Sequence, residues 1–441
     1  MEALAMQSYF GISTRFLIIA RILLVVSLVL RCFERLFFFF SFYQDIPEIY
    51  TASLNIFELK NYSLTGGSIL LVPTLYVVTI FSAIIFLINK HFHKSNIFLL
   101  FLLLSISSLD GVYIGKGLRI IWPYLLFFFC LPKVPLSGKN IGNSIKYYNS
   151  VVNLTIFVFA AVIYFCSFYF KTDPVWTESR NALLYFLLSD QWSLPWAKFL
   201  THYPELLKVL TTAFLILEAS ALSLLLFALF RNKQVGATAK NLVAISFVLF
   251  HFSIGITSVL TVFSLAMISF WFLFFDTNPK AKVKYFKITF LEKSLIGFLT
   301  LSLIAWNYFP KHLDRIPSIS FERQLAEGLR SYTIPQHWGL VAPAPGFHNY
   351  EVLTYKRTPT KEPQFLFSSK TMPQGKYFAD AFFTSAYLEQ SLFNGFLPKY
   401  CNGDEEFLEF HYHKRKIDIM SKNDKPFKVF KIIKKCIGYA K

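Results

Sequence analysis

Long apolar runs separated by short polar loops dominate the pattern of this chain. A helix needs about 20 mostly apolar residues to cross the roughly 30 Å hydrocarbon core of a bilayer. The longer runs predict membrane-spanning helices, although the last of them has only 15 residues, and two shorter runs predict short crossings. The longer runs are 16–40, 69–88, 151–170, 206–230, 242–275 and 294–308, and the shorter ones are 96–108 and 118–131.

The run 242–275 is 34 residues long, which is too much for one untilted span, and it contains Gly255. We therefore expect it to cross twice. Lysine and arginine concentrate in the cytoplasmic loops of membrane proteins, and here they cluster in alternate loops. With two crossings for 242–275, the signs alternate over eight to nine spans. The N-terminus is then cytoplasmic and the tail from Pro310 is extracytoplasmic. The basic loops carry Lys90, Lys94, Lys133, Lys139, Lys146, Arg231, Lys233, Lys240, Lys280, Lys282, Lys284 and Lys287.

The tail has a different texture from the rest of the chain. Residues 376–397 have a helical pattern, and "EFLEFHYHKRKIDIM" alternates as a strand does. A further strand or helix is expected at 427–434. We predict an all-α polytopic membrane protein, with a bundle of about 8–9 transmembrane helices over 10–309. A small extracytoplasmic α/β cap follows over 310–441.

Composition supports this class of protein and narrows its partners. Hydrophobic residues make up 54% of the chain and charged residues only 16%, against about 25% in average soluble domains. The net charge is +18. Because the basic residues lie in short loops and in the tail, this charge indicates topology and contact with anionic lipid. The expected partner is the lipid bilayer, and no nucleic acid is predicted.

Ionisable residues inside apolar runs are costly and are candidates for function. Three of them are His251, Glu218 and Arg21. Each also has a structural interpretation. His251 can be a packing residue that bonds a neighbouring helix. Glu218 can neutralise Arg21 or His251. The side chain of Arg21, like those of Arg31 and Arg35, can extend to the membrane surface.

A second group of ionisable residues follows the run 151–170 in "KTDPVWTES". Lys171 with Trp176 is typical of an anchor at the membrane surface. Alternatively, Lys171 is held against apolar surface, where desolvation lowers the pKa of a lysine and makes it available as a general base. The residues alone leave both interpretations open. The chain has no phosphate-binding glycine loop, no zinc-binding HExxH and no nucleophile elbow, and no metal site is predicted.

Several stretches, taken in order, resemble one family. "KTDPVWTES" is similar to the segment in which a lysine ends a span before an acidic residue and a tryptophan. The further matches are "YFLLSDQW" with Trp192, "LILEASALSLL" with Glu218, "FHFSIGITSVL" with His251, and "QHWGLVAPAP". The chain resembles the horizontally transferred transmembrane (HTTM) domain proteins, which are relatives of vitamin K-dependent gamma-glutamyl carboxylase. The resemblance covers about residues 15 to 420.

The resemblance implies a chemistry. In the carboxylase, the lysine that matches Lys171 deprotonates vitamin K hydroquinone, and the resulting strong base removes a proton from a protein glutamate. The implied cofactor is reduced vitamin K or another quinol, and the implied partner is a protein or peptide on the extracytoplasmic side. The carboxylase also has a catalytic histidine, where this chain has Lys94 in "HFHKSN". That departure speaks against the carboxylation half of the reaction.

We therefore take Lys171, His251 and Glu218 as candidate catalytic residues. Trp176, Trp192 and Arg21 are the candidate substrate-binding residues. The leading hypothesis is a carboxylase-like, quinol-dependent enzyme, a lyase or an oxidoreductase, in a bacterial inner membrane. The alternative is a non-catalytic membrane scaffold or partner subunit, in which the same polar residues stabilise helix packing. A lipid or small-molecule transporter is a third hypothesis.

Overall fold

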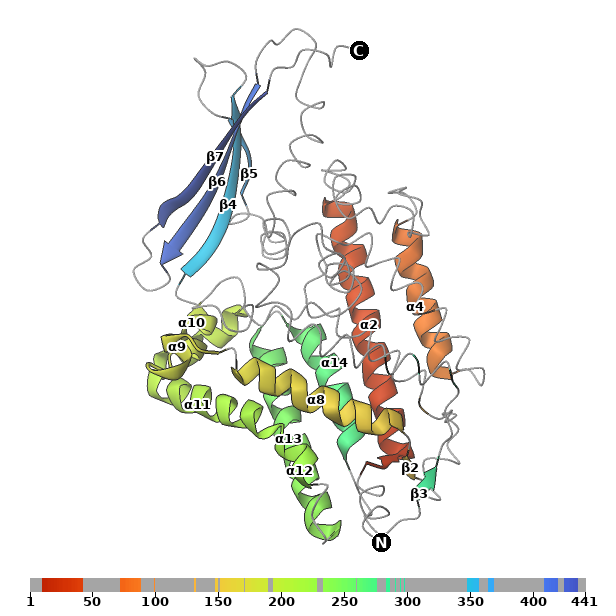
Figure 1. The fold of residues 1–441 in the computed structure, drawn as a ribbon. Coiled ribbons are helices and arrows are strands. Elements are labelled where there is room, and N and C mark those ends of the chain that lie inside the picture. The colour runs from red at the N-terminus through yellow and green to blue at the C-terminus, as the bar shows by residue number, and fades with distance from the viewer. Residues whose placement is uncertain are drawn as a thin grey trace, which may run out of the picture.

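The computed structural model describes a helical body and two small sheets (Figure 1). The described residues are 10–42, 72–88, 147–149, 151–169, 171–188, 193–227, 233–258, 260–275, 283–285, 347–356, 364–368, 408–418 and 424–434, with the single positions 99, 131, 290, 294 and 297. The expected spans 96–108, 118–131 and 294–308 and the expected helix 376–397 lie almost wholly outside these residues. Helices make up most of the described chain.

Among the described residues, three helices are long and apolar enough to cross a bilayer. They are α2 (Thr14–Phe42), α8 (Val151–Tyr169) and α13 (Lys233–Thr257). The shorter apolar helix α4 (Val72–Ile88) runs beside α2 (Figure 1). The sequence predicted each of these helices to within a few residues, except that α13 begins well before the apolar run at 242.

The predicted break inside 242–275 is confirmed. Helix α13 ends at Thr257, and α14 (Thr261–Trp271) begins after a short connection and continues into the 3₁₀ helix η6 (Phe272–Phe274). The two helices are antiparallel, because Gly255 faces Ser264 while, further from the turn, the Phe247 ring stacks on Trp271 with the centroids 4.1 Å apart.

The predicted continuous span 206–230 is interrupted. Helix α11 (Pro204–Ser220) ends before α12 (Ser223–Leu226) begins, and Ala221 and Leu222 between them keep right-handed helical dihedral angles. Around the junction the N–H of Ala221 donates to the carbonyl of Glu218, and that of Leu224 donates to Ala221. These bonds span three residues, so the chain tightens to 3₁₀ geometry there. The Ser220 and Ser223 hydroxyls also donate to carbonyls three residues earlier, a pattern that bends helices.

The helices carry apolar residues on their outer faces and polar residues on their inner faces. On α13 an exposed stripe is formed by Leu242, Ile245, Leu249, Phe252 and Ile256, which are 65%, 45%, 60%, 54% and 42% exposed. Lys240 and His251 on the same helix are buried. On α4, Thr79 and Ser82 are buried, and their hydroxyls donate to carbonyls of their own helix. Water as the solvent would favour the opposite arrangement, so this inversion fits a lipid surrounding.

The arginines of α2 follow the same rule and correct a sequence expectation. Arg21 and Arg31 do not extend to the surface but are buried, with 2% and 9% of each residue exposed. Lipid cannot solvate a guanidinium, whereas polar groups in the protein interior can. Arg35 is in α2, but its side chain lies outside the described part.

The C-terminal strands form an antiparallel sheet in the order β5-β4-β6-β7. Their bounds are Phe347–Lys356 (β4), Gln364–Ser368 (β5), Leu408–Asp418 (β6) and Asp424–Lys434 (β7). The predicted strand at 408–418 is confirmed, and the segment at 427–434 is a strand. A second small sheet joins Ile12–Ser13 (β1), Tyr147–Asn149 (β2) and Val283–Tyr285 (β3), which the sequence did not predict.

The close approach of α13 and α14 gives a test of the hairpin. A Cβ placed on Gly255 would lie 3.0 Å from the Cβ of Ser264, whereas nothing lies within 4 Å of a Cβ on Gly297. We expect Gly255→Ala to destabilise the protein by about 1–3 kcal/mol through overpacking. Gly297→Ala should instead be neutral or stabilising by up to about 1 kcal/mol, since alanine favours helix.

Thermal unfolding in detergent measures both effects. Adding Ser264→Gly to Gly255→Ala should restore much of the lost stability, because it removes the side chain that the new methyl group meets. Equal behaviour of Gly255→Ala and Gly297→Ala would contradict the packing of the hairpin.

Candidate functional site

Lys171 lies just past the end of α8, and its side chain is buried. Its backbone N–H donates to the carbonyl of Phe168 at 3.1 Å, which continues the last turn of the helix. Its side chain reaches back to Ser167, four residues earlier, and only 4% of the residue is exposed. A lysine at a water-facing surface would be largely exposed, so this burial favours the second interpretation of Lys171, that of a lysine held against apolar surface.

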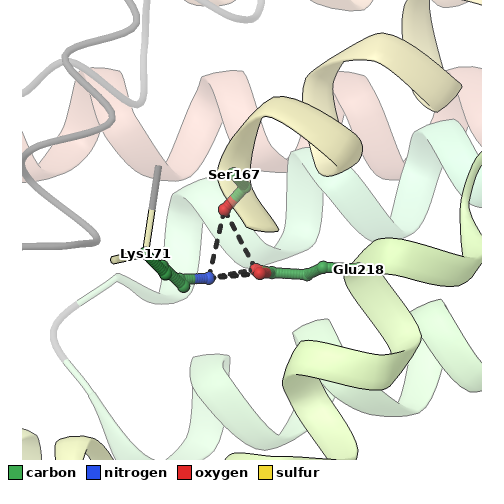
Figure 2. Close-up of polar contacts among 3 residues, drawn as sticks. All are labelled: Ser167, Lys171 and Glu218. Atoms are coloured by element: carbon green, nitrogen blue, oxygen red, sulfur yellow. Dashed lines mark hydrogen bonds and ion pairs between the residues drawn. The ribbon is translucent and has the colours of Figure 1, made fainter. Parts of the chain in front are cut away.

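Glu218 meets Lys171 from the opposite side (Figure 2). The Nζ atom donates to both carboxylate oxygens of Glu218, with 2.5 Å to Oε1, and to the hydroxyl of Ser167 at 3.1 Å. The Ser167 hydroxyl donates to Oε1 of Glu218 at 3.0 Å. An ammonium group has three N–H donors, so these three acceptors satisfy all of them. The result is a closed polar triangle that joins α8 to the last turn of α11.

The chain after Lys171 folds so that Trp176 lies beside the amine. Helix α9 (Pro174–Thr177) begins at Asp173, whose carboxylate accepts from the N–H of Val175 at 2.9 Å. This is an N-cap followed by proline in the first turn, a favoured start for a helix. The Nζ of Lys171 lies 4.7 Å from the centroid of the Trp176 ring. A buried cation over an aromatic face is stabilised by about 2 kcal/mol.

The turn that follows α9 is fixed by Arg180. This residue has a φ of 58°, a left-handed conformation that is uncommon for residues other than glycine. Its guanidinium donates to the carbonyl of Trp176 at 3.1 Å. The Trp176 side chain packs with Ala182 and Leu215 in one buried cluster. The local structure of "KTDPVWTESR" therefore places the Trp176 ring next to the amine of Lys171.

Burial sets the electrostatics of Lys171. Loss of hydration lowers the pKa of the Lys171 amine below its ordinary value of 10.5, while the carboxylate of Glu218 opposes that shift. The net direction is downward. Glu218 is itself buried, with 2% of the residue exposed. The site thus contains one amine and one carboxylate in direct contact and shielded from water.

A second polar cluster lies deeper along the same helix. The indole N–H of Trp271 donates to the hydroxyl oxygen of Tyr164 at 2.9 Å, and that hydroxyl lies 2.5 Å from Nε2 of His251. Because indole is a donor only, the Tyr164 oxygen accepts from Trp271, whereas the direction of its bond with His251 is set by the tautomer of the imidazole. The cluster joins α8, α13 and α14. Within the described residues, Nδ1 of His251 has no hydrogen-bond partner.

The sequence predictions for the site have mixed outcomes. Lys171, Glu218 and Trp176 are brought together. His251 belongs to the separate cluster with Tyr164, and Glu218 is paired with Lys171. Arg21 is buried on α2, which packs against α4 and α14. Trp192 lies outside the described residues.

Three polar residues of these clusters were missed from the sequence. They are Ser167, Tyr164 and Trp271. A signal for the first two was available, because Tyr164, Ser167 and Lys171 are spaced i, i+3 and i+7 and so share one face of α8. Nothing in the sequence marks Trp271 apart from the many other aromatic residues.

No protein-family model matches the chain, and neither does a curated protein or a solved structure. A function for this protein therefore has to be argued from the site itself and from the motifs in its sequence.

The buried pair predicts a characteristic pattern of stability. Removing one partner leaves an uncompensated buried charge, which costs about 3–5 kcal/mol, whereas replacing both by apolar residues is often neutral. We expect Lys171→Met and Glu218→Leu to lower thermal stability in detergent strongly. The double variant should regain most of the loss.

The exposed pair of Lys208 and Glu205 is a matched control, since it has the same chemistry on the surface, with the two side chains 38% and 80% exposed. Its single variants should change stability by less than about 1 kcal/mol. Additive losses at Lys171 and Glu218, with no recovery in the double variant, would argue against the buried pair.

Proposed function

We propose that this protein is a membrane-embedded enzyme in which the amine of Lys171 acts as a general base on a lipophilic substrate with an acidic hydroxyl group, such as a quinol. One observation carries the proposal: Lys171 is buried and held by Glu218 and Ser167 against Trp176. Membrane anchoring needs neither burial nor a carboxylate partner, whereas a base needs both a lowered pKa and a fixed position.

Burial favours the neutral form of the amine. A base must begin the reaction without its proton. Loss of hydration disfavours the ammonium form of Lys171 and so lowers its pKa. Glu218 touches Nζ directly and opposes this shift. Ser167 contacts both groups, so it can keep them aligned in either state.

The surroundings of the site favour a lipophilic substrate. Lys171 follows a helix that is apolar enough to span a bilayer, and the outer faces of α11 and α13 are apolar. A quinol partitions into such a membrane, and its hydroxyl groups are more acidic than those of an alcohol. Deprotonation of the quinol by Lys171 would give a quinolate and an ammonium group. Glu218 would then stabilise that ammonium group.

The motif order supports a more specific form of this proposal. The chain would belong to the HTTM group, and the quinolate would react with oxygen as in vitamin K-dependent carboxylase. A protein or peptide on the extracytoplasmic side would then be the final substrate, in a bacterial inner membrane. In that scheme Trp176 shapes the site beside Lys171. The cluster of His251 and Tyr164 would lie about 10 Å further along α8, at 1.5 Å per residue.

A second candidate function is a non-catalytic scaffold or partner subunit. It is favoured by the fact that the Lys171–Glu218 pair joins α8 to α11 and so contributes to helix packing. Substitution by arginine separates the two candidates. Arginine keeps the positive charge and can pair with a carboxylate, but it does not act as a base because its pKa exceeds about 12.

We expect wild-type protein in lipid vesicles to convert reduced vitamin K or a menaquinol to its epoxide under oxygen. Lys171→Arg and Lys171→Ala should both lower this activity by about 100-fold or more, which is the usual contribution of a general base to the rate. Lys208→Arg and Lys208→Ala should keep it. The measurement is chromatography of the products.

Two results would count against the base. One is full activity in Lys171→Arg. The other is the absence of product from wild-type protein that a thermal unfolding transition shows to be folded. That result would favour the non-catalytic scaffold.

The pKa of Lys171 predicts a pH profile. A base works when it is deprotonated, so kcat/KM should rise with pH and level off below 10.5, because burial lowers the pKa of this amine. Glu218 opposes the lowering by attracting the proton. Glu218→Gln should therefore lower the pKa further and move the rising limb to lower pH.

Glu205→Gln, at the exposed pair, should leave the profile in place. A shift of the Glu218→Gln limb to higher pH would contradict the assigned electrostatics of the site.

A further inference from the structure

An exposed apolar stripe runs along the 3₁₀ helix η4 (Pro195–His202) and the first turns of α11. Its members are Trp196, Phe199, Tyr203, Leu206 and Val209, which are 49%, 52%, 57%, 50% and 65% exposed. Within η4, Trp196 and Phe199 are three residues apart, and within α11 so are Leu206 and Val209, so each pair lies on one side of its own helix. Tyr203 lies at the junction between the two helices. The stripe contains two aromatic residues with a polar tip, Trp196 and Tyr203.

The opposite side of the same helices packs against the protein. Ala197 and Leu207 are buried together with Leu187 of α10 (Ala182–Leu188). Further along α11, Leu215 packs on Trp176, the residue whose ring lies beside the amine of Lys171. The stripe is thus the outer side of a packed unit whose inner side reaches the candidate site.

The order of residue types along the stripe indicates which solvent covers it. Aromatic residues come first on η4, and aliphatic ones follow on α11, ending with Ile216, which is 65% exposed. Tryptophan and tyrosine prefer the boundary between headgroups and hydrocarbon, and aliphatic residues prefer the hydrocarbon itself. The buried residues of α11 are Leu207, Thr211, Leu215 and Glu218, of which two are polar, whereas the exposed Leu206, Val209 and Ile216 are all aliphatic.

The stripe also joins a surface of the same kind. Helix α11 packs against α13, a candidate membrane span whose outward face carries the apolar stripe from Leu242 to Ile256. These two packed helices both carry exposed apolar side chains, as helices in contact with lipid do. A protein partner would need to cover both faces, whereas the bilayer that α13 crosses already does so.

We propose that η4 is the interfacial anchor of this protein and that its partner is the lipid bilayer. Trp196, Phe199 and Tyr203 lie at headgroup level, and α11 descends from there into the hydrocarbon. Through Leu215 and Trp176 the anchor fixes the depth of Lys171. The anchoring role that the sequence offered to Lys171 with Trp176 thus belongs to η4, since Trp176 is only 8% exposed. This inference does not depend on the proposed enzyme activity.

The depth of Trp196 tests the proposal. Protein is reconstituted in phosphatidylcholine vesicles that contain lipid with a nitroxide quencher either near the headgroup or near the end of the acyl chain. The difference between the fluorescence of wild type and Trp196→Phe isolates the signal of Trp196. We expect at least twofold stronger quenching by the shallow label than by the deep one, and little quenching by aqueous acrylamide.

Trp271, which is fully buried, supplies the control, and the signal isolated with Trp271→Phe should respond to none of the three quenchers. Phe199→Asp places a charge in the stripe and should reduce the shallow quenching of Trp196 by half or more. Ser179→Asp adds the same charge at an exposed polar position and should not.

Three outcomes would overturn the proposal. Strong acrylamide quenching without lipid quenching would place η4 in water, and the absence of all quenching would mean that protein covers the stripe. Stronger quenching by the deep label would place η4 inside the hydrocarbon. If Phe199→Asp does not fold, the wild-type and Trp196→Phe comparison decides alone.

Discussion

Two opposite charges buried in contact, those of Lys171 and Glu218, are the constraint on which the rest of this site depends. Neither group is stable alone at its position, because an unpaired buried charge costs several kcal/mol. Their attraction therefore requires that the end of α8 and the last turn of α11 stay together. The residues around the pair complete its bonding, with Ser167 as a hydrogen-bond partner of both groups and the Trp176 ring beside the amine.

The helix irregularity beside Glu218 belongs to the same arrangement. Regular α-helical bonding would continue α11 into α12 in a straight line, but the carbonyl of Glu218 accepts from Ala221 instead of the next residue. A 3₁₀ stretch inside a helix often marks strain or a functional hinge. Here the 3₁₀ bonding ends α11 within one turn of Glu218.

The sequence predicts what depends on local pattern. Runs of apolar residues located α2, α4 and α8, and the length of 242–275 with its internal glycine predicted the turn between α13 and α14. Alternation in the tail predicted β6. These features could be predicted because each depends on the local spacing of apolar residues, which follows from whether a segment faces lipid, water or the protein interior. The start of α13 was missed because residues 233–241 are polar enough to resemble a loop.

The contacts between distant segments could not be read in this way. Lys171 and Glu218 are 47 positions apart, and the pattern of residues suggested Arg21 or His251 as the partner of Glu218 and no partner for Lys171. Extension to the membrane surface was one alternative for Arg21 and Arg31, but both are buried in the structure. The residue Ser167 completes the site but is an ordinary helix residue in the sequence. Only its spacing from Lys171 connects the two.

The central claim is that Lys171 is a general base whose pKa is lowered by burial. The most direct measurement is an NMR titration of the lysine side chains in protein labelled with ¹³C at Cε, in lipid nanodiscs, with Lys171→Arg to assign the signal. The account predicts that the Lys171 signal titrates clearly below 10.5, while exposed lysines such as Lys208 titrate near that value. A Lys171 signal that stays protonated to 10.5 or above would contradict the account and would leave the pair as a structural link between α8 and α11.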